Sequence, residues 1–555
     1  MKSLRQDWPL NIIAALTALL GIATLSSTLY ELVHLHYARI IIADAHLTLI
    51  AGISLIYLGM LLRRGKHNAW LAALAVFPLI LIRNTRHFVF DDEMSGHYLL
   101  LVLTNLVLPI LLLICLVIFR QRYVVRSEAT TFRIALRRAI IILLIAFLYG
   151  VIGFQLFDRR DFHEEIGPST AAHYTIDQIG LTTNNKPTPH TRRSLFFVDS
   201  LATVSVVSLA YVAFSLFSPI RFRLAHRQQD YIDAKNIVGC RPKTSEDFFK
   251  LWPRDKVYFF NQSRTSMLAY RVSRGVALVV GDPLGTPAEV KQLLISFDEL
   301  CRANDWRTAL VHTDKSNLKL YKRLGLEAQK IGEEALVDVA NFNSSVVRNK
   351  YFRNINNRFS KGGYTFEVLE PPHDQATLDR LAVVSDSWLS SPGRAERGFM
   401  LGYFSAAYMQ QCRIAVVKDQ SGNIQAFLNQ VPDVLNKEAN YDFLRHESGS
   451  LSNINDFLML NFIKYLGIEG YSHLNMGLCP LSGLDKENDA DKNLLGSILR
   501  FAYANGGRFY SFEGLKRFKS KYEPNWEDRY IVYGGGIAGF GRVLSALLKA
   551  MTNIA

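Results

Sequence analysis

The chain has 555 residues, of which 49% are hydrophobic and 20% charged, and this length exceeds what a single hydrophobic core normally serves. The formal net charge of +14 favours an anionic partner, either a lipid surface or a nucleic acid. The five cysteines show no C-x-x-C spacing, which argues against a disulfide framework or a zinc site and is typical of reduced thiols.

Residues 1–220 contain six apolar runs that we interpret as membrane spans, for which a helix needs about 20 residues. Arginines and lysines concentrate in every second loop, for example at Arg63 and Arg64 and again at Arg120 and Arg122. The positive-inside rule therefore predicts that both termini and the polar remainder of the chain are cytoplasmic, with a polar external loop from Asp158 to Arg193. The predicted spans are Leu10–Val33, Ile40–Leu62, Ala69–Ile82, Tyr98–Phe119, Ala139–Phe157 and Leu195–Pro219.

The remainder alternates strand-like and helix-like segments, which predicts α/β or α+β architecture. Val276–Val280 is an all-apolar strand, and the capping box at 286–289 predicts a helix that runs to about Asn304. A second set of similar size follows Pro371-Pro372. Other predicted strands are 308–313, 335–339, 414–418, 424–431, 441–445 and 473–478, and other predicted helices are 316–324, 376–389, 455–466 and 492–503.

We therefore expect a juxtamembrane linker at 221–245, a first small α/β unit at 246–370, a second at 371–535 and a C-terminal amphipathic helix at 536–555. The apolar residues of this last helix recur at helical spacing. Two interpretations remain open for it: the helix lies on the membrane, or it closes the fold. Its apolar positions are Val543, Leu544, Leu547, Leu548 and Met551.

Several loops and strands carry polar groups in apolar surroundings, although no standard catalytic motif is present. The turn at Asp282 is interpreted as structural, because the proline that follows removes an amide donor. Asp442 and Arg445 share a strand whose alternation points them apart, so they cooperate only if the strand ends or bulges between them. Glu396 lies in a glycine-bearing loop that is a candidate lid, and Asn475 precedes a glycine that allows close backbone approach.

The stretch 511–530 concentrates cations, acids and aromatic residues. Lys516, Arg517, Lys519 and Lys521 cannot share one buried face on either a helix or a strand. One interpretation is a solvated basic helix that ends at Pro524. In the other, some of these cations face a cavity or an anionic partner.

Seven motifs occur in a fixed order along the polar half, and together they resemble the catalytic domain of the aminoacyl-phosphatidylglycerol synthases, the multiple peptide resistance factor family. They include Asp442-x-x-Arg445 and the run from Gly514 through Lys519 and Lys521 to Arg529 and Tyr530. The remaining motifs are Val280-Gly281-Asp282-Pro283, Ile331-Gly332-Glu333-Glu334-Ala335, Ser385-Asp386-Ser387-Trp388-Leu389, Glu396-Arg397-Gly398-Phe399 and Asn475-x-Gly477.

This resemblance implies an α-helical membrane domain followed by two fused acetyltransferase-like (GNAT) units. It also implies transfer of an amino acid, most often lysine and next alanine, from aminoacyl-tRNA to phosphatidylglycerol at the bacterial inner membrane. The product lowers the negative charge of the membrane and confers resistance to cationic antimicrobial peptides. The resemblance implies no metal and no organic cofactor. Six spans are fewer than the longest members have, so we expect no full flippase module.

For the chemistry, we assign Asp442 to the substrate ammonium or to general-base duty, and Arg445 to pairing with Asp442 or to polarising the ester carbonyl. Glu513 is a second candidate for the ammonium. Arg517, Lys519, Lys521 and Arg529 are assigned to the lipid phosphate or the tRNA acceptor end, with Asp282, Glu396 and Asn475 in supporting loops.

Three alternatives remain open. An acyltransferase with another donor would normally show a glycine-rich pyrophosphate loop, and none occurs between Ile414 and Leu466. A non-enzymatic lipid-binding or RNA-binding protein would not need the groups around Asp442 and those around Arg529 to share a cleft. Transport would require broken helices with paired polar residues, for which only Asp44 and His46 are candidates. Oligomerisation is compatible with every alternative.

Overall fold

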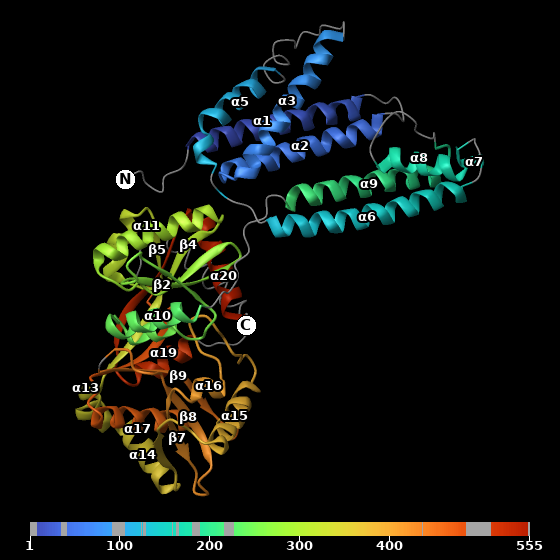
Figure 1. Cartoon of the computed structure of the whole chain (residues 1–555). Coiled ribbons are helices and arrows are strands. Elements are labelled where there is room, and N and C mark those ends of the chain that lie inside the picture. The colour runs from blue at the N-terminus through green and yellow to red at the C-terminus, as the bar shows by residue number, and fades with distance from the viewer. Residues whose placement is uncertain are drawn as a thin grey trace. The chain divides into compact units, whose positions relative to one another are not determined.

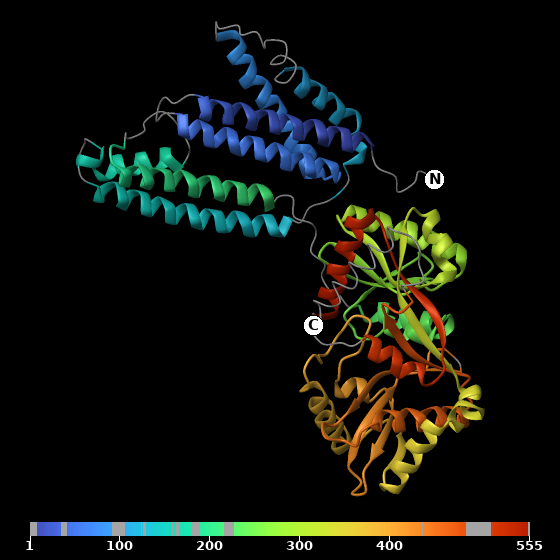
Figure 2. The same cartoon turned by 180° about the vertical axis from the view of Figure 1, so that it is seen from behind.

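The chain divides into two compact units, a helical unit formed mainly by Gln6–Arg221 and an α/β unit formed mainly by Phe222–Ala555 (Figures 1 and 2). The predicted helix at 492–503 and the side chains of Asp44 and His46 lie outside the described part of the chain. The computed structural model describes residues 8–34, 41–90, 106–123, 125, 129–157, 159–162, 166–179, 189–215, 227–435, 437–483 and 512–552.

Glycines let the first two helices of the helical unit touch along their backbones. A Cβ atom on Gly21 would lie 2.6 Å from the carbonyl oxygen of Gly52, and one on Gly59 would lie 2.7 Å from that of Ala14. Such contacts between small residues are typical of helix pairs in membranes. The helices are α1 (Trp8–His34), α2 (Ile41–Arg63), α3 (His67–Phe90), α5 (Leu108–Ile118), α6 (Ala129–Leu156), α7 (Arg159–Phe162), α8 (Pro168–Ile179) and α9 (Arg192–Ser215).

The segment predicted as a polar external loop, Asp158–Arg193, contains helices α7 and α8 that pack back on α6 and α9. Phe154, Phe162, Ala171 and Phe197 are buried together at this contact, where apolar side chains face inward from all four helices. Gly153 makes room for the ring of Phe197, because a Cβ atom there would lie 2.2 Å from it. The apolar residues of the loop therefore give it a folded core that its overall polarity conceals.

Within the described residues, two segments are long and apolar enough to cross a membrane, Trp8–Ser26 and Leu136–Leu156. Three shorter helical segments are also apolar: Ala51–Arg63, His67–Ile82 and Leu108–Ile118. Each of the six predicted spans overlaps one of the helices α1, α2, α3, α5, α6 and α9. Membrane crossing by all six stays a prediction.

The α/β unit is built on one sheet, which has 11 strands within the described residues, in the order β1-β2-β3-β4-β11-β5-β10-β9-β8-β7-β6. Each half contains one parallel pair, β3 with β4 and β9 with β10, among otherwise antiparallel neighbours. The strands are β1 (Val257–Phe260), β2 (Met267–Ser273), β3 (Val276–Val280), β4 (Arg307–Asp314), β5 (Glu327–Asp338), β6 (Thr365–Leu369), β7 (Arg413–Lys418), β8 (Ile424–Gln430), β9 (Glu438–His446), β10 (His473–Pro480) and β11 (Asn525–Tyr533).

The last strand, β11, is inserted into the first half of the sheet. It pairs antiparallel with β4 on one side and with β5 on the other, and the long strand β5 pairs in turn with β10 of the second half. Removing β11 would leave β4 and β5 without their common neighbour. The two halves therefore share one sheet, and the predicted limits of two separate units, 246–370 and 371–535, stay a prediction.

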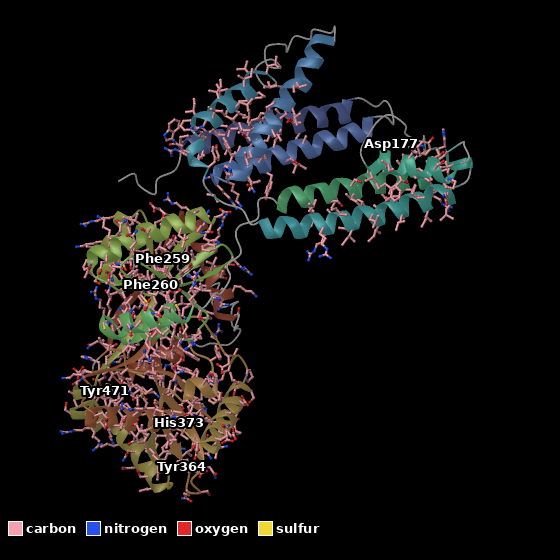
Figure 3. The ribbon with its side chains drawn as sticks, in the orientation of Figure 1. Asp177, Phe259, Phe260, Tyr364, His373 and Tyr471 are labelled. Carbon is pink, nitrogen blue, oxygen red and sulfur yellow. The ribbon has the colours of Figure 1, made fainter. Side chains whose placement is uncertain are left out.

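Helices cover both faces of the first half. The alternating residues of β3 divide between them: Ala277 and Val279 pack under helix α11 (Pro287–Ala303), whereas Leu278 and Val280 pack under helix α20 (Gly536–Thr552). Phe259, labelled in Figure 3, packs against Phe297 of α11 in a tilted ring geometry, with ring centroids 5.4 Å apart. Helix α20 buries its apolar stripe in this core, so the second interpretation of the C-terminal helix is correct: it closes the fold.

Helices also cover both faces of the second half of the sheet. Ala415 and Val417 of β7 face helices α14 (Lys350–Lys361) and α17 (Ile454–Ile468), and Ile414 and Val416 face helices α15 (Gln375–Leu389) and α16 (Ala406–Met409). Period-2 burial on both faces is what a central strand of a covered sheet requires. The remaining elements of the unit are α10 (Gln228–Cys240), η3 (Ser245–Lys250), η4 (Lys315–Asn317), α12 (Leu318–Arg323), α13 (Val339–Ser344), η5 (Val346–Arg348) and α19 (Phe512–Ser520).

Candidate functional site

Strand β9 carries Asp442 and Arg445, and a bulge brings both to one face. The register of β9 against β8 shifts by one residue, so that Asp442 and Phe443 together oppose Asn429. The Asn429 side chain accepts the Phe443 amide at 2.7 Å and so holds the extra residue. Simple alternation would point Asp442 and Arg445 apart, and a bulge breaks that alternation. The bulge that cooperation between Asp442 and Arg445 requires is therefore present.

Asp442 is hydrogen-bonded by the segment between α15 and β7. Its Oδ2 accepts hydrogen bonds from the Gly402 amide at 2.8 Å and from the Tyr408 hydroxyl at 3.1 Å. A Cβ atom on residue 402 would lie 2.1 Å from the same carboxylate oxygen and 2.5 Å from the Tyr408 ring, so a larger residue would displace these side chains. Burial raises the pKa of Asp442 to about 7, although both hydrogen bonds and the Arg445 charge oppose the rise. This carboxyl group can exchange a proton near neutral pH.

Arg445 forms its ion pair with Glu396. Its Nη1 and Nη2 atoms lie 2.9 and 2.8 Å from the two Glu396 oxygens, and Nη1 also donates to the Ser385 hydroxyl. The guanidinium is buried, 4.1 Å from the centroid of the Phe443 ring. The expected direct pairing of Arg445 with Asp442 is not observed, because the fork geometry of the guanidinium is taken up by Glu396.

The loop that carries Glu396 is anchored three residues further on. Phe399 has a left-handed backbone (φ 70°), its amide donates to Asp255 Oδ2 at 3.0 Å, and its carbonyl accepts from Lys256 Nζ at 2.6 Å. Asp255 also binds Lys256 and Arg271, and all three side chains are buried. The loop interpreted as a lid is thus held at its centre by a buried ionic cluster.

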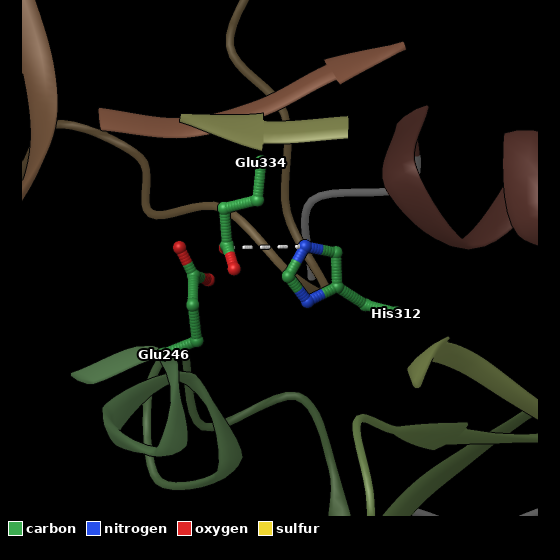
Figure 4. Close-up of side chains that lie close together, drawn as sticks. All are labelled: Glu246, His312 and Glu334. Carbon is green, nitrogen blue, oxygen red and sulfur yellow. Dashed lines mark ion pairs between the residues drawn. The ribbon is translucent and has the colours of Figure 1, made fainter. Parts of the chain in front are cut away.

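A second group of ionisable side chains lies close by and is connected to β9. Three possible metal-ligand atoms lie within 4.8 Å of one another, on Glu246 of η3, His312 of β4 and Glu334 of β5 (Figure 4). Asn440 of β9 donates to Glu246 at 3.1 Å. Burial raises the pKa of Glu246, with the Glu334 charge adding to the rise, and burial lowers the pKa of His312 to about 4. Among the described residues, these three are the set whose chemistry suits a metal ion.

Arg529 of β11 binds Glu334 of this group together with two further carboxylates. Its guanidinium binds Glu334, Glu527 at 2.8 Å and Asp314 at 2.9 Å. Burial opposes the charge of Arg529, and these carboxylates more than compensate, so its pKa is raised. Asn440, Glu246, Glu334 and Arg529 follow one another in space, so the strand that carries Asp442 and the strand that carries Arg529 meet in one polar network.

A cavity of about 30 Å³ opens beside this network. Glu246, His312 and Arg529 line it together with Lys250 and Asp282. A space of this size holds about one ordered water molecule. The network therefore has room beside it for an ordered water molecule.

Two of the predicted phosphate-binding lysines have internal partners. Lys519 is buried and donates to the carbonyl oxygens of Gly477 and Leu478 at 2.8 and 3.1 Å, and burial lowers its pKa. Lys521 forms an ion pair with buried Asp456 at 2.9 Å. Together with Arg529, these cations stabilise the fold, and their assignment to a lipid phosphate or a tRNA end stays a prediction.

Arg517 and Glu513 differ from these residues, because both are exposed on α19. Within the described residues, neither has a hydrogen-bond or ion-pair partner. No bond joins Glu513 to Asp442 or Arg445, so its expected role beside them stays a prediction. Arg517 is the predicted phosphate-binding cation that is most available to an external anion.

Asp282 and Asn475 shape the backbone. Asp282 accepts the Asp314 amide at 2.9 Å and the Tyr321 hydroxyl, and burial raises its pKa. These bonds agree with the structural interpretation of its turn. Asn475 accepts the Gly477 amide at 2.8 Å, at a point where the register of β10 against β5 shifts.

Sequence reasoning missed Glu246, His312 and Tyr408. His312 did carry a signal, because it interrupts the apolar strand Thr308–Thr313, where a buried imidazole needs a reason. Glu246 and Tyr408 carried none, since their bonds to Asn440 and Asp442 of β9 arise only in the folded chain.

Comparison with known proteins decides the family. The family described as "Phosphatidylglycerol lysyltransferase, C-terminal" matches residues 241–533. The chain belongs to this family. The resemblance drawn from the seven motifs is therefore confirmed.

The curated relatives of this family member are longer. A phosphatidylglycerol lysyltransferase of Staphylococcus epidermidis is 32% identical over 281 residues, which is 50% of this chain and 33% of that protein. One of Staphylococcus haemolyticus is 30% identical over 332 residues, 60% of this chain and 38% of that protein. The matched region thus spans about a third of the length of these relatives.

Two solved structures match the α/β unit at nearly their full length. The structure of L-PGS from Bacillus licheniformis is 26% identical with a TM-score of 0.52, covering 59% of this chain and 97% of that one. The C-terminal domain of a putative lysylphosphatidylglycerol synthetase from Agrobacterium fabrum is 28% identical with a TM-score of 0.51, covering 59% and 98%. The predicted α/β fold of the polar half is thereby confirmed.

Proposed function

We propose that this phosphatidylglycerol lysyltransferase family member is a membrane-bound aminoacyltransferase that moves an amino acid from aminoacyl-tRNA to phosphatidylglycerol. The observation that carries the proposal is Asp442, a partly buried carboxyl group whose pKa is raised to about 7, held beside the Arg445–Glu396 pair on the face of β9. A general base is most effective when its pKa lies near the working pH.

In the proposed reaction, a glycerol hydroxyl oxygen of the lipid attacks the ester carbonyl carbon of the aminoacyl-tRNA. The new ester bond forms as the bond to the terminal ribose oxygen breaks, and Asp442 takes the hydroxyl proton and returns it to that leaving oxygen. Holding two large substrates in line supplies much of the rate. Arg445 stabilises the negative charge that develops on the carbonyl oxygen.

A second role for Asp442 is recognition of the α-ammonium or side-chain ammonium of the amino acid. A carboxylate that pairs with an ammonium must also be ionised, so both roles need Asp442 deprotonated. The two roles differ in which kinetic constant they affect, because recognition lowers KM and proton transfer raises kcat. Glu513 and the cations Arg517, Lys519, Lys521 and Arg529 stay candidates for further substrate contacts.

The helical unit supports a membrane location. Many large apolar side chains on its helices are exposed, for example Ile22 (55%), Leu79 (65%), Ile145 (60%) and Leu156 (77%). Such a surface is unfavourable in water and suits lipid. We propose six spans in the bacterial inner membrane with the α/β unit cytoplasmic, where tRNA and anionic lipid meet a chain of net charge +14.

Lysine is the amino acid we propose, since the curated relatives are named phosphatidylglycerol lysyltransferase. Alanine is the alternative. The lipid product carries added positive charge and would lower the attraction of cationic antimicrobial peptides to the membrane.

The test is lipid extraction from a bacterial host that expresses the full chain, followed by thin-layer separation, ninhydrin staining and mass determination. A new lipid that contains both an amino group and phosphate is expected with the wild-type chain and is lost with Asp442→Asn. Asp419→Asn is the matched control, because Asp419 lies in an exposed turn. Absence of a new lipid from well-expressed wild-type chain would favour another acyl donor or a binding role.

A further inference from the structure

Glu334 leaves one carboxylate oxygen without a hydrogen bond in the protein interior. The residue is 1% exposed, and its Oε2 atom is bound by Arg529. Its Oε1 atom has no hydrogen-bond partner among the described residues. A buried carboxylate oxygen is normally satisfied, so an orphaned one indicates a missing partner.

Two further side chains, one on β4 and one on η3, place possible metal-ligand atoms near this oxygen (Figure 4). The Nε2 atom of His312 lies 3.5 Å from Glu334 Oε1, and Glu246 brings a carboxylate oxygen within 4.8 Å of both. Two ligands that each lie about 2.1 Å from a tetrahedral zinc ion are themselves about 3.4 Å apart. The His312–Glu334 spacing is therefore already that of a metal site, and Glu246 needs only a small side-chain adjustment.

The neighbouring cations have acids of their own. Arg529 is shared by Glu334, Asp314 and Glu527, and Lys250 forms an ion pair with Asp247 at 2.5 Å. Lys519, the other nearby cation, donates to backbone carbonyl oxygens. Around the imidazole, the five carboxyl groups of Glu246, Glu334, Asp314, Glu527 and Asp247 therefore outnumber the three cations by two, which is enough for a divalent ion.

From this geometry we propose that Glu246, His312 and Glu334 bind a divalent transition-metal cation, with zinc the best match. One imidazole nitrogen and two carboxylate oxygens are the ligand types of an open zinc site, and water in the adjoining cavity completes the coordination. The imidazole selects against magnesium and calcium, which prefer all-oxygen sites. Bound there, the cation ties η3 to strands β4 and β5. The proposal does not rest on the proposed lipid chemistry, and the cluster is joined to β9 through the Asn440–Glu246 hydrogen bond.

The test uses the full chain, purified in detergent without a polyhistidine tag, stripped with a chelator and then dialysed against limiting zinc. Metal analysis is expected to find about one equivalent per chain, and a competing zinc dye gives the affinity. His312→Asn is expected to weaken zinc binding at least about tenfold, since even indirect partners of a zinc ligand carry that much. His473→Asn changes a partly exposed histidine on β10 outside this cluster; it is the matched control and should bind as the wild type does.

A second variant and a second readout keep the proposal testable if His312→Asn fails to fold. Glu246→Gln keeps the shape of the side chain and is expected to weaken zinc to a similar degree. Cobalt in place of zinc is expected to give the visible absorption of a four-coordinate ion, and this band should be lost in Glu246→Gln. No zinc on the wild-type chain, or equal zinc on wild type and Glu246→Gln, would overturn the proposal. Saturable binding of lysine amide at this cluster, unaffected by chelator and lost in Glu246→Gln, would overturn it too and assign the cluster to an ammonium group.

Discussion

Glu396 and Arg445 form a two-point ion pair in which both carboxylate oxygens meet the guanidinium, at 2.9 and 2.8 Å. Glu396 lies in the loop that also supplies the Gly402 amide to Asp442, and Arg445 lies three residues after Asp442 on β9. The loop is therefore bonded to strand β9 at two places, through the Glu396–Arg445 ion pair and through the Gly402–Asp442 hydrogen bond. Its geometry fixes where Asp442 sits.

We expect Glu396→Gln to lower both activity and stability. The change leaves the buried Arg445 charge without its partner, and breaking a buried pair in this way costs about 3 kcal/mol or more of the unfolding free energy. The rate of lipid synthesis should fall at least about tenfold, because Asp442 and Arg445 lose their fixed geometry. Initial rates and thermal unfolding of the full chain measure the two effects.

The control for this change is Glu367→Gln, which removes a similar ion pair, with Lys418, from a surface where Glu367 is 50% exposed. Exposed pairs contribute about 0–1 kcal/mol, so neither rate nor stability should change appreciably. Equal losses in both variants would contradict a special role for the Glu396–Arg445 pair.

The pH dependence of the reaction should follow Asp442. Its carboxyl group must be ionised, so the rate is expected to rise with pH through about 7, the pKa of this group. Tyr408→Phe removes a hydrogen bond that favours the carboxylate, and the pKa of Asp442 should then move higher. The rising limb should shift by about one pH unit, because a hydrogen bond to a charged group contributes about 1.5 kcal/mol.

Kinetics between about pH 5.5 and 8.5, corrected for spontaneous ester hydrolysis, give this measurement around the shifted pKa. A limb in kcat indicates general-base catalysis, and a limb in KM indicates recognition of the substrate ammonium. An unshifted limb in Tyr408→Phe would rule out Asp442 as the titrating group. Tyr403→Phe, a nearby tyrosine with no hydrogen bond to Asp442, is the control.

Local sequence pattern predicted most strands and helices of the α/β unit. Val276–Val280 is apolar at every position, so its burial on both faces is visible without knowledge of its neighbours. Asn525–Tyr533 was not predicted as a strand, because Glu527 and Arg529 interrupt its apolar pattern. Its place between β4 and β5 depends on partners about 200 residues away in the chain, for which no local pattern exists.

The candidate site was predicted in part for the same reason. Asp442, Arg445 and Glu396 were found through their motifs, and the structure brings them together. Pairing with Asp442 was one of two roles predicted for Arg445, and its partner is Glu396 instead, because a bulge and a loop decide which carboxylate reaches it. Lys519 was predicted to meet a phosphate, and burial against two carbonyl oxygens is a property of the tertiary structure that its basic surroundings conceal.

Within the stretch 511–530, substitution of an exposed cation and of a cation with an internal partner should have different effects on stability and on KM. Arg517→Ala is expected to leave stability within about 0.5 kcal/mol, as for other exposed side chains, and to raise KM for an anionic substrate in a salt-dependent way. Lys521→Met should instead lower the unfolding free energy by about 3 kcal/mol, because buried Asp456 loses its partner. Thermal unfolding and KM at two salt concentrations distinguish them. The interpretation fails if Arg517→Ala leaves KM unchanged at low salt.

Because α20 packs in the core, substitutions on its buried and exposed faces should differ in their effect on stability. A helix that lay on the membrane would not show this difference. Phe540 is fully buried in the core of the first half, whereas Ile537 on the same helix is 45% exposed. Phe540→Ala is expected to lower the unfolding free energy by about 3–5 kcal/mol, and Ile537→Ala by less than about 0.5 kcal/mol. Thermal unfolding of the full chain in detergent and partition of both variants onto anionic vesicles give the comparison. If α20 lay on the membrane, Ile537→Ala would weaken vesicle binding and Phe540→Ala would leave the unfolding temperature unchanged.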